Sequence, residues 1–81
     1  MRKNNMNEVL EILMEINPTI DYSKEKNLID NKVLDSFSII TLVSEISDHF
    51  DIDIGPKWLK PEHFNSVEAI WNMVQILQDE E

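Results

Sequence analysis

Residues 36–50, with the sequence SFSIITLVSEISDHF, carry the strongest periodic pattern in the chain. A step of about 100° per residue gathers most of the apolar side chains on one arc and places polar side chains on the opposite side. Counted from Ser36, the apolar arc consists of Ile39, Leu42, Val43, Ile46 and Phe50. The pattern predicts an amphipathic helix, and we expect this helix to be the central element of the fold.

A second helical pattern lies near the N-terminus, over residues 5–16. Apolar side chains recur there at helical spacing, and Glu8, Glu11 and Glu15 take the other face. Asn17-Pro18 ends the pattern, because a residue before proline is pushed out of the α region. From Asn17 to Leu34 no period persists, so residues 17–35 are expected to form a long loop.

Two further helices are expected after residue 55. Pro61 suits the first position of a short helix over residues 61–64. The last helix is expected over residues 66–78, with Asn65 as its N-cap and Glu68 completing a capping box. Trp58, in the connection before these helices, is expected to plug the core.

The composition agrees with an all-helical chain. One glycine and three prolines argue against a turn-rich β fold, and 42% apolar residues indicate a globular domain. The fold class we predict is all-α: an antiparallel four-helix bundle of three long helices and one short helix, with a long loop between the first two. Residues 1–81 form one domain in this interpretation.

The net charge of −9 narrows the possible partners. Nucleic-acid binding is excluded because phosphate backbones need a basic surface, and a partner with a basic patch is the natural complement. No apolar run approaches the ~18 residues of a membrane span, and the N-terminus lacks the apolar segment of a secretory signal. We therefore expect a cytoplasmic monomer that does not insert into membranes.

Catalysis and metal binding find little support. The absence of cysteine excludes a thiol nucleophile and zinc–thiolate sites. Ser36 and His49 stand at opposite ends of a helix, roughly 20 Å apart at ~1.5 Å per residue, so they cannot act as a dyad. The acids around Asp48 do not match the spacing of a calcium-binding loop. The protein is not expected to be an enzyme.

The dipeptide Asp35-Ser36 opens the central helix. Either side chain could cap it, which is the ordinary role of such residues. Ser36 could instead be a chemical handle, since it closes a long loop and a helix N-terminus favours a phosphate. The helix that follows has an acidic outer face on which Phe37 and Ile40 fall outside the apolar arc, as a partner-binding helix would have.

The stretch LDSFSIITLVSEISDHFDIDI, followed by LKPEHFNSVEAIWNMV, resembles the acyl carrier protein family, including its peptidyl and D-alanyl carrier relatives. The resemblance extends over nearly the whole chain. It implies a stand-alone carrier whose Ser36 bears a covalent 4′-phosphopantetheine arm, the thiol of which holds an acyl or aminoacyl group as a thioester. Asp35 would cap the helix and help the modifying enzyme to recognise the site. The recognition face would consist of Phe37, Ile40, Thr41, Glu45 and Asp48.

The implied partners are a phosphopantetheinyl transferase, an acyl- or aminoacyl-loading ligase, and a downstream acyltransferase or synthase with a basic docking patch. A D-alanyl or peptidyl carrier loaded by an adenylating ligase is the alternative within the family. An unmodified acidic helical adaptor is the alternative outside it. Family members often have glycine three or four residues before the serine, where this chain has Val33 and Lys32, so Asn31 is expected to make the turn. Phe37 replaces the usual Leu or Met.

Overall fold

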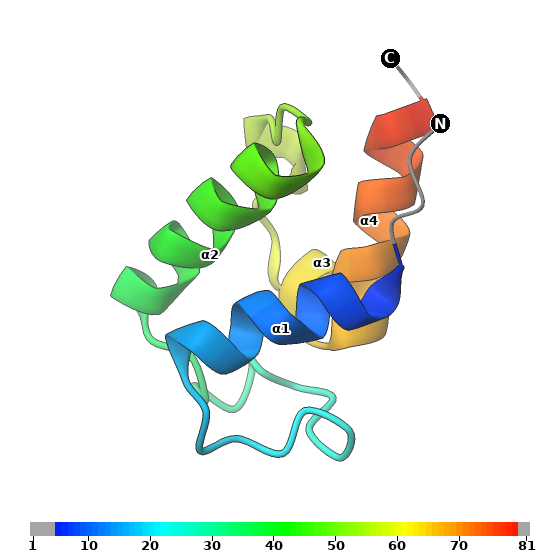
Figure 1. The fold of residues 1–81 in the computed structure, drawn as a ribbon. Coiled ribbons are helices and arrows are strands. Elements are labelled where there is room, and N and C mark those ends of the chain that lie inside the picture. The colour runs from blue at the N-terminus through cyan, green and yellow to red at the C-terminus, as the bar shows by residue number, and fades with distance from the viewer. Residues whose placement is uncertain (1–4, 80–81) are drawn as a thin grey trace.

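The computed structural model describes residues 5–79, and four α-helices account for most of them (Figure 1). In chain order these are α1 (Met6–Ile16), α2 (Ser36–Phe50), α3 (Pro61–Phe64) and α4 (Val67–Asp79). One 3-10 turn, Pro56–Trp58, precedes α3 and was not expected. Residues 5–79 contain no strand, so the prediction of an all-helical fold with three long helices and one short helix is confirmed.

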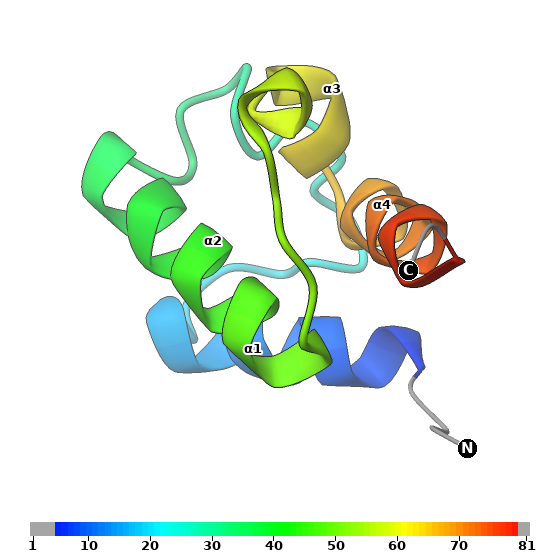
Figure 2. The same ribbon diagram turned by 90° about the horizontal axis from the view of Figure 1, so that it is seen from above.

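The three long helices enclose the core from different directions. In Figure 1, α2 and α4 both rise from bottom to top, while α1 lies across their lower front; Figure 2 shows α4 end-on and α1 lying crosswise. α1 packs against both α2 and α4, and α3 packs against α4. The N-terminal helix is therefore the element that joins the other two long helices.

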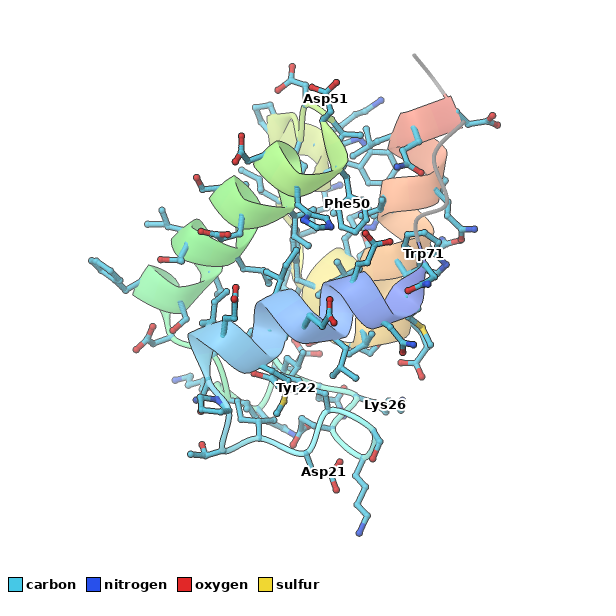
Figure 3. The ribbon with its side chains drawn as sticks, viewed as in Figure 1. Asp21, Tyr22, Lys26, Phe50, Asp51 and Trp71 are labelled. Atoms are coloured by element: carbon cyan, nitrogen blue, oxygen red, sulfur yellow. The ribbon has the colours of Figure 1, made fainter. Side chains whose placement is uncertain are left out.

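The core is apolar throughout residues 5–79, since no polar or charged residue there is buried. Its buried members are Val9, Ile12, Leu13, Tyr22, Leu28, Leu34, Leu42, Ile46, Phe50, Ile52, Phe64, Val67, Ile70, Met73, Val74 and Leu77. Figure 3 shows Phe50 directed between α2 and α4, where its ring centroid lies 6.0 Å from that of Trp71. The apolar arc predicted for α2 is thus the face that packs into the core.

The loop between α1 and α2 is tied down by side chains. Tyr22 is buried beneath α1 (Figure 3), and its hydroxyl lies 3.0 Å from the carbonyl oxygen of Leu13 and 2.8 Å from that of Asn17. Burial raises the pKa of this phenol. Lys26 reaches α4, where its Nζ lies 2.6 Å from Oε2 of Glu68 and lowers the pKa of that carboxyl group. These contacts join the loop to both terminal helices.

The start of α4 differs from the expected capping box. The hydroxyl of Ser66, not the side chain of Asn65, accepts the hydrogen bond from the N–H of the first turn, at Ala69 (3.0 Å). Asn65 instead turns toward the long loop, where its Oδ1 accepts from the backbone N–H groups of Ile29 and Asp30. The expected cap at Asn65 was wrong, because the loop amides compete for its side chain.

Candidate functional site

The candidate site lies where the long loop enters α2. Asp35 has an extended backbone, and its Oδ1 accepts a hydrogen bond from the N–H of Ser38 at 2.7 Å. This bond lowers the pKa of the Asp35 carboxyl group below its ordinary value. Asp35 is therefore the N-cap, and its negative charge also suits the positive end of the helix dipole.

Ser36 is the first residue of α2, and it is exposed. Among residues 5–79 its hydroxyl makes no hydrogen bond, because the cap position is already filled by the neighbouring carboxylate. A phosphoester at this oxygen would stand at a helix N-terminus, which attracts negative charge. The geometry leaves the hydroxyl open to a modifying enzyme without the loss of a structural contact.

The loop segment before Ser36 is fixed by Asn65. Its side-chain oxygen accepts hydrogen bonds from two loop amides, as described above. In addition, the carbonyl oxygen of Asn65 accepts a hydrogen bond from the N–H of Leu28 at 2.8 Å. The Nδ2 of Asn65 donates to Oδ2 of Asp30 at 3.1 Å. Leu34, two residues before Ser36, is buried in the core. One residue between α3 and α4 and one core side chain thus hold the loop that presents the serine.

The turn in this segment ends at Lys32. Its φ of 55° places it in the left-handed region, and its N–H donates to the carbonyl oxygen of Ile29. Asn31, which was expected to make the turn, lies within it, between Ile29 and Lys32, but the left-handed residue is Lys32. The left-handed position falls four residues before the serine, and a residue with a Cβ is strained there relative to glycine.

The five residues of the predicted recognition face lie on the outer side of α2. Phe37 and Ile40 are 81% and 69% exposed, and Glu45 and Asp48 are exposed as well. The hydroxyl of Thr41 donates to the carbonyl oxygen of Phe37 at 3.1 Å. Phe37, Thr41 and Glu45 face a groove shared with α1, whereas Ile40 and Asp48 are not part of that groove.

An apolar recess of about 120 Å³ lies beside the first turns of α2. It is lined by Ile29, Ile39, Leu59, Lys60, Pro61 and Phe64. Sequence reasoning missed this recess because Ile29 and Leu59 lie in connections, far apart along the chain. Leu59 remains 52% exposed, so the recess opens to solvent.

The two histidines do not contact Ser36; each has a neighbour of another kind. His49 Nε2 lies 2.9 Å from Oε1 of Glu8 on α1. The ring of His63 packs edge-on against Trp58, with centroids 4.7 Å apart. Trp58 is half-buried against the core, and its indole nitrogen is buried with no hydrogen-bond partner among residues 5–79.

Within residues 5–79, no three side chains of His, Cys, Asp or Glu come together as a metal would require, and none of the helices there combines the length and apolar character needed to cross a bilayer. Comparison of the chain with family models, curated proteins and solved structures returned no match.

Proposed function

We propose that this protein is a carrier that holds an acyl or aminoacyl group as a thioester on a 4′-phosphopantetheine arm attached to Ser36. The observation that carries the proposal is the separation of roles at the start of α2. Asp35 supplies the cap to Ser38, while the hydroxyl of Ser36 is exposed and makes no hydrogen bond within residues 5–79. A cap alone would not need the hydroxyl of Ser36.

The residues around Ser36 fit the arm. A transferase could reach Ser36 Oγ, which would bond to the phosphorus of the pantetheine phosphate of coenzyme A. The bond from that phosphorus to the second phosphate would break, releasing adenosine 3′,5′-bisphosphate, and the hydroxyl proton would pass to the transferase. The arm supplies the thiol that a cysteine-free chain lacks.

The fold proposed for this function is a variant of the antiparallel four-helix bundle. α1 and α2 pack together and run in opposite senses across Figure 1, and α3 closes the bundle against α4. This arrangement supports a rigid α2 whose first residue and outer face are both accessible to partner enzymes.

The core favours a small cargo. Leu42, Ile46 and Phe50 of α2 and Ile70 and Met73 of α4 are fully buried and fill the space between the helices. The recess of about 120 Å³ beside α2 is of the size that holds one small apolar ring. An aminoacyl or other short group fits this space better than a long fatty chain, which supports the D-alanyl or peptidyl class of carrier.

Intact mass spectrometry tests the proposal. The protein is incubated with a broad-specificity phosphopantetheinyl transferase, coenzyme A and Mg²⁺. A gain of one phosphopantetheinyl group on the wild type, absent from Ser36→Ala, is the expected result. An unmodified helical adaptor would bind partners through the same acidic face but would show no gain.

A further inference from the structure

A long groove runs along the line where α1 packs against α2, and it is lined by one stripe of residues from each helix. The stripe on α2 is Phe37, Thr41, Glu45 and His49, spaced four residues apart. The stripe on α1 is Glu8, Glu11, Ile12 and Glu15. The two halves of the groove have volumes of about 290 and 590 Å³, and they share Ile12, Glu15 and Glu45.

The rim of this groove is acidic. Glu8, Glu11 and Glu15 line it from α1 and Glu45 lines it from α2, while neither helix contains a lysine or an arginine. His49, which contacts Glu8, is the one residue of the lining that can become cationic. A ligand in the groove therefore meets an excess of negative charge.

The groove also has apolar surface. Ile12 lies at its floor, Met14 is 41% exposed at one side, and Phe37 stands 81% exposed at the end nearest Ser36. From Phe37 to His49 the groove follows α2 for about 12 residues, or ~18 Å at ~1.5 Å per residue. An occupant therefore needs basic and apolar side chains on one face, over three to four helical turns.

We propose that this groove, defined by the two stripes above, docks a basic amphipathic helix of a partner protein. Lysine or arginine side chains of the partner pair with the glutamates, and apolar side chains between them cover Ile12, Met14 and Phe37. A second copy of this chain does not fit, since it carries the same net charge of −9 and its own acidic helices.

The proposal goes beyond the carrier function and does not depend on Ser36. It adds three glutamates of α1 to the docking surface, and it leaves Ile40 and Asp48 outside the groove. The predicted recognition face is thereby divided. Phe37, Thr41 and Glu45 belong to both surfaces, whereas Ile40 and Asp48 belong to the recognition face alone.

The test is an NMR titration of ¹⁵N-labelled protein, at low salt, with a synthetic Lys/Leu helix of about 12 residues. A peptide of the same composition, scrambled so that it has no amphipathic face, is the peptide control. We expect shifts at Glu11, Glu15 and Glu45 with the amphipathic peptide and weaker, diffuse shifts with the scrambled one.

Two double variants separate the groove from net charge alone. The double variant Glu11→Gln, Glu15→Gln is expected to weaken the affinity for the amphipathic peptide about fivefold, because two exposed ion pairs are lost. The double variant Asp53→Asn, Glu62→Gln removes the same charge from exposed sites outside the groove. It is expected to weaken the affinity for the peptide less than about twofold.

Three outcomes overturn the proposal. Equal weakening by both double variants shows that only long-range charge acts. Shifts confined to α3 and α4 place the peptide on another surface. Concentration-dependent shifts of the groove resonances without any peptide show that a second copy of the chain is the occupant.

Discussion

The carboxylate of Asp35 accepts a hydrogen bond from the backbone N–H of Ser38 at 2.7 Å, and this contact assigns the cap of α2 to Asp35. The neighbouring serine is therefore not needed to start the helix. Its hydroxyl is exposed at the point where the helix dipole most favours a phosphate. The proposed attachment of an arm at Ser36 depends on this difference between two adjacent residues.

Asp35→Asn and Asp35→Ala test the cap. Asparagine is a good N-cap and alanine is not. We therefore expect Asp35→Ala to lower the melting temperature at pH 7 more than Asp35→Asn does. The folded pKa of Asp35 lies below the ordinary value of 3.8, so its charge stabilises the fold above that pH and the contribution is lost as the pH falls through the folded pKa. Melting curves of wild type and Asp35→Asn should therefore converge in acid. A constant difference between them from pH 7 to pH 2 would contradict the assignment.

Lys32→Gly is expected to stabilise the protein by about 0.5 kcal/mol. Glycine removes a left-handed strain of about 1–2 kcal/mol and adds about 0.4–1 kcal/mol of unfolded-state entropy. The control is Lys24→Gly, at an exposed turn residue whose φ is not positive, which should destabilise by about 0.4–1 kcal/mol. Urea unfolding measures both changes, and the same sign for both would show that Lys32 is not strained.

Asn65→Ala is expected to loosen the loop that presents Ser36. The N–H groups of Ile29 and Asp30 lose their common acceptor, which costs about 1–3 kcal/mol for the part-buried group. Hydrogen exchange should accelerate at these two amides. Ser66→Ala is the matched control: it removes the cap of α4, at a cost of about 1 kcal/mol, and should leave the two loop amides protected. Equal acceleration in both variants would mean that the loop depends on α4 as a whole and not on Asn65.

Glu45→Lys combined with Asp48→Lys tests the outer face of α2. We expect transfer of phosphopantetheine at low salt to slow about fivefold, because steering toward a basic partner is weakened. The free energy of unfolding should change by less than about 0.5 kcal/mol, since both side chains are exposed. Glu62→Lys with Asp79→Lys makes the same charge change outside α2 and should slow the transfer less. Equal rates for all three proteins would remove Glu45 and Asp48 from the recognition face.

Helical periodicity was sufficient to predict the long helices, because their apolar spacing follows the 3.6-residue turn closely. It was insufficient where two roles compete for one side chain. Asn65 and Ser66 both suit an N-cap, and only the position of the loop amides decides that Ser66 takes it. Lys32 carries no local signal for a left-handed conformation, which the packing of the loop imposes.

The candidate site shows the same limit. The exposure of Ser36 and Phe37 could be predicted from their helical phase and position. The groove between α1 and α2 could not, because it depends on how Glu11 and Glu15 are placed opposite Glu45 by packing between elements far apart in the sequence. The apolar recess also joins distant connections, which no single periodic segment contains.

Mass mapping of the modified residue tests the central claim most directly. Wild type, Ser36→Ala and Ser44→Ala are each incubated with a broad-specificity phosphopantetheinyl transferase, coenzyme A and Mg²⁺, then weighed intact and digested. Ser44 is a matched control, because it is an exposed serine within the same helix. The account predicts one phosphopantetheinyl group on wild type and on Ser44→Ala, located at Ser36, and none on Ser36→Ala. No mass gain on wild type, or an equal gain on Ser36→Ala, would contradict it.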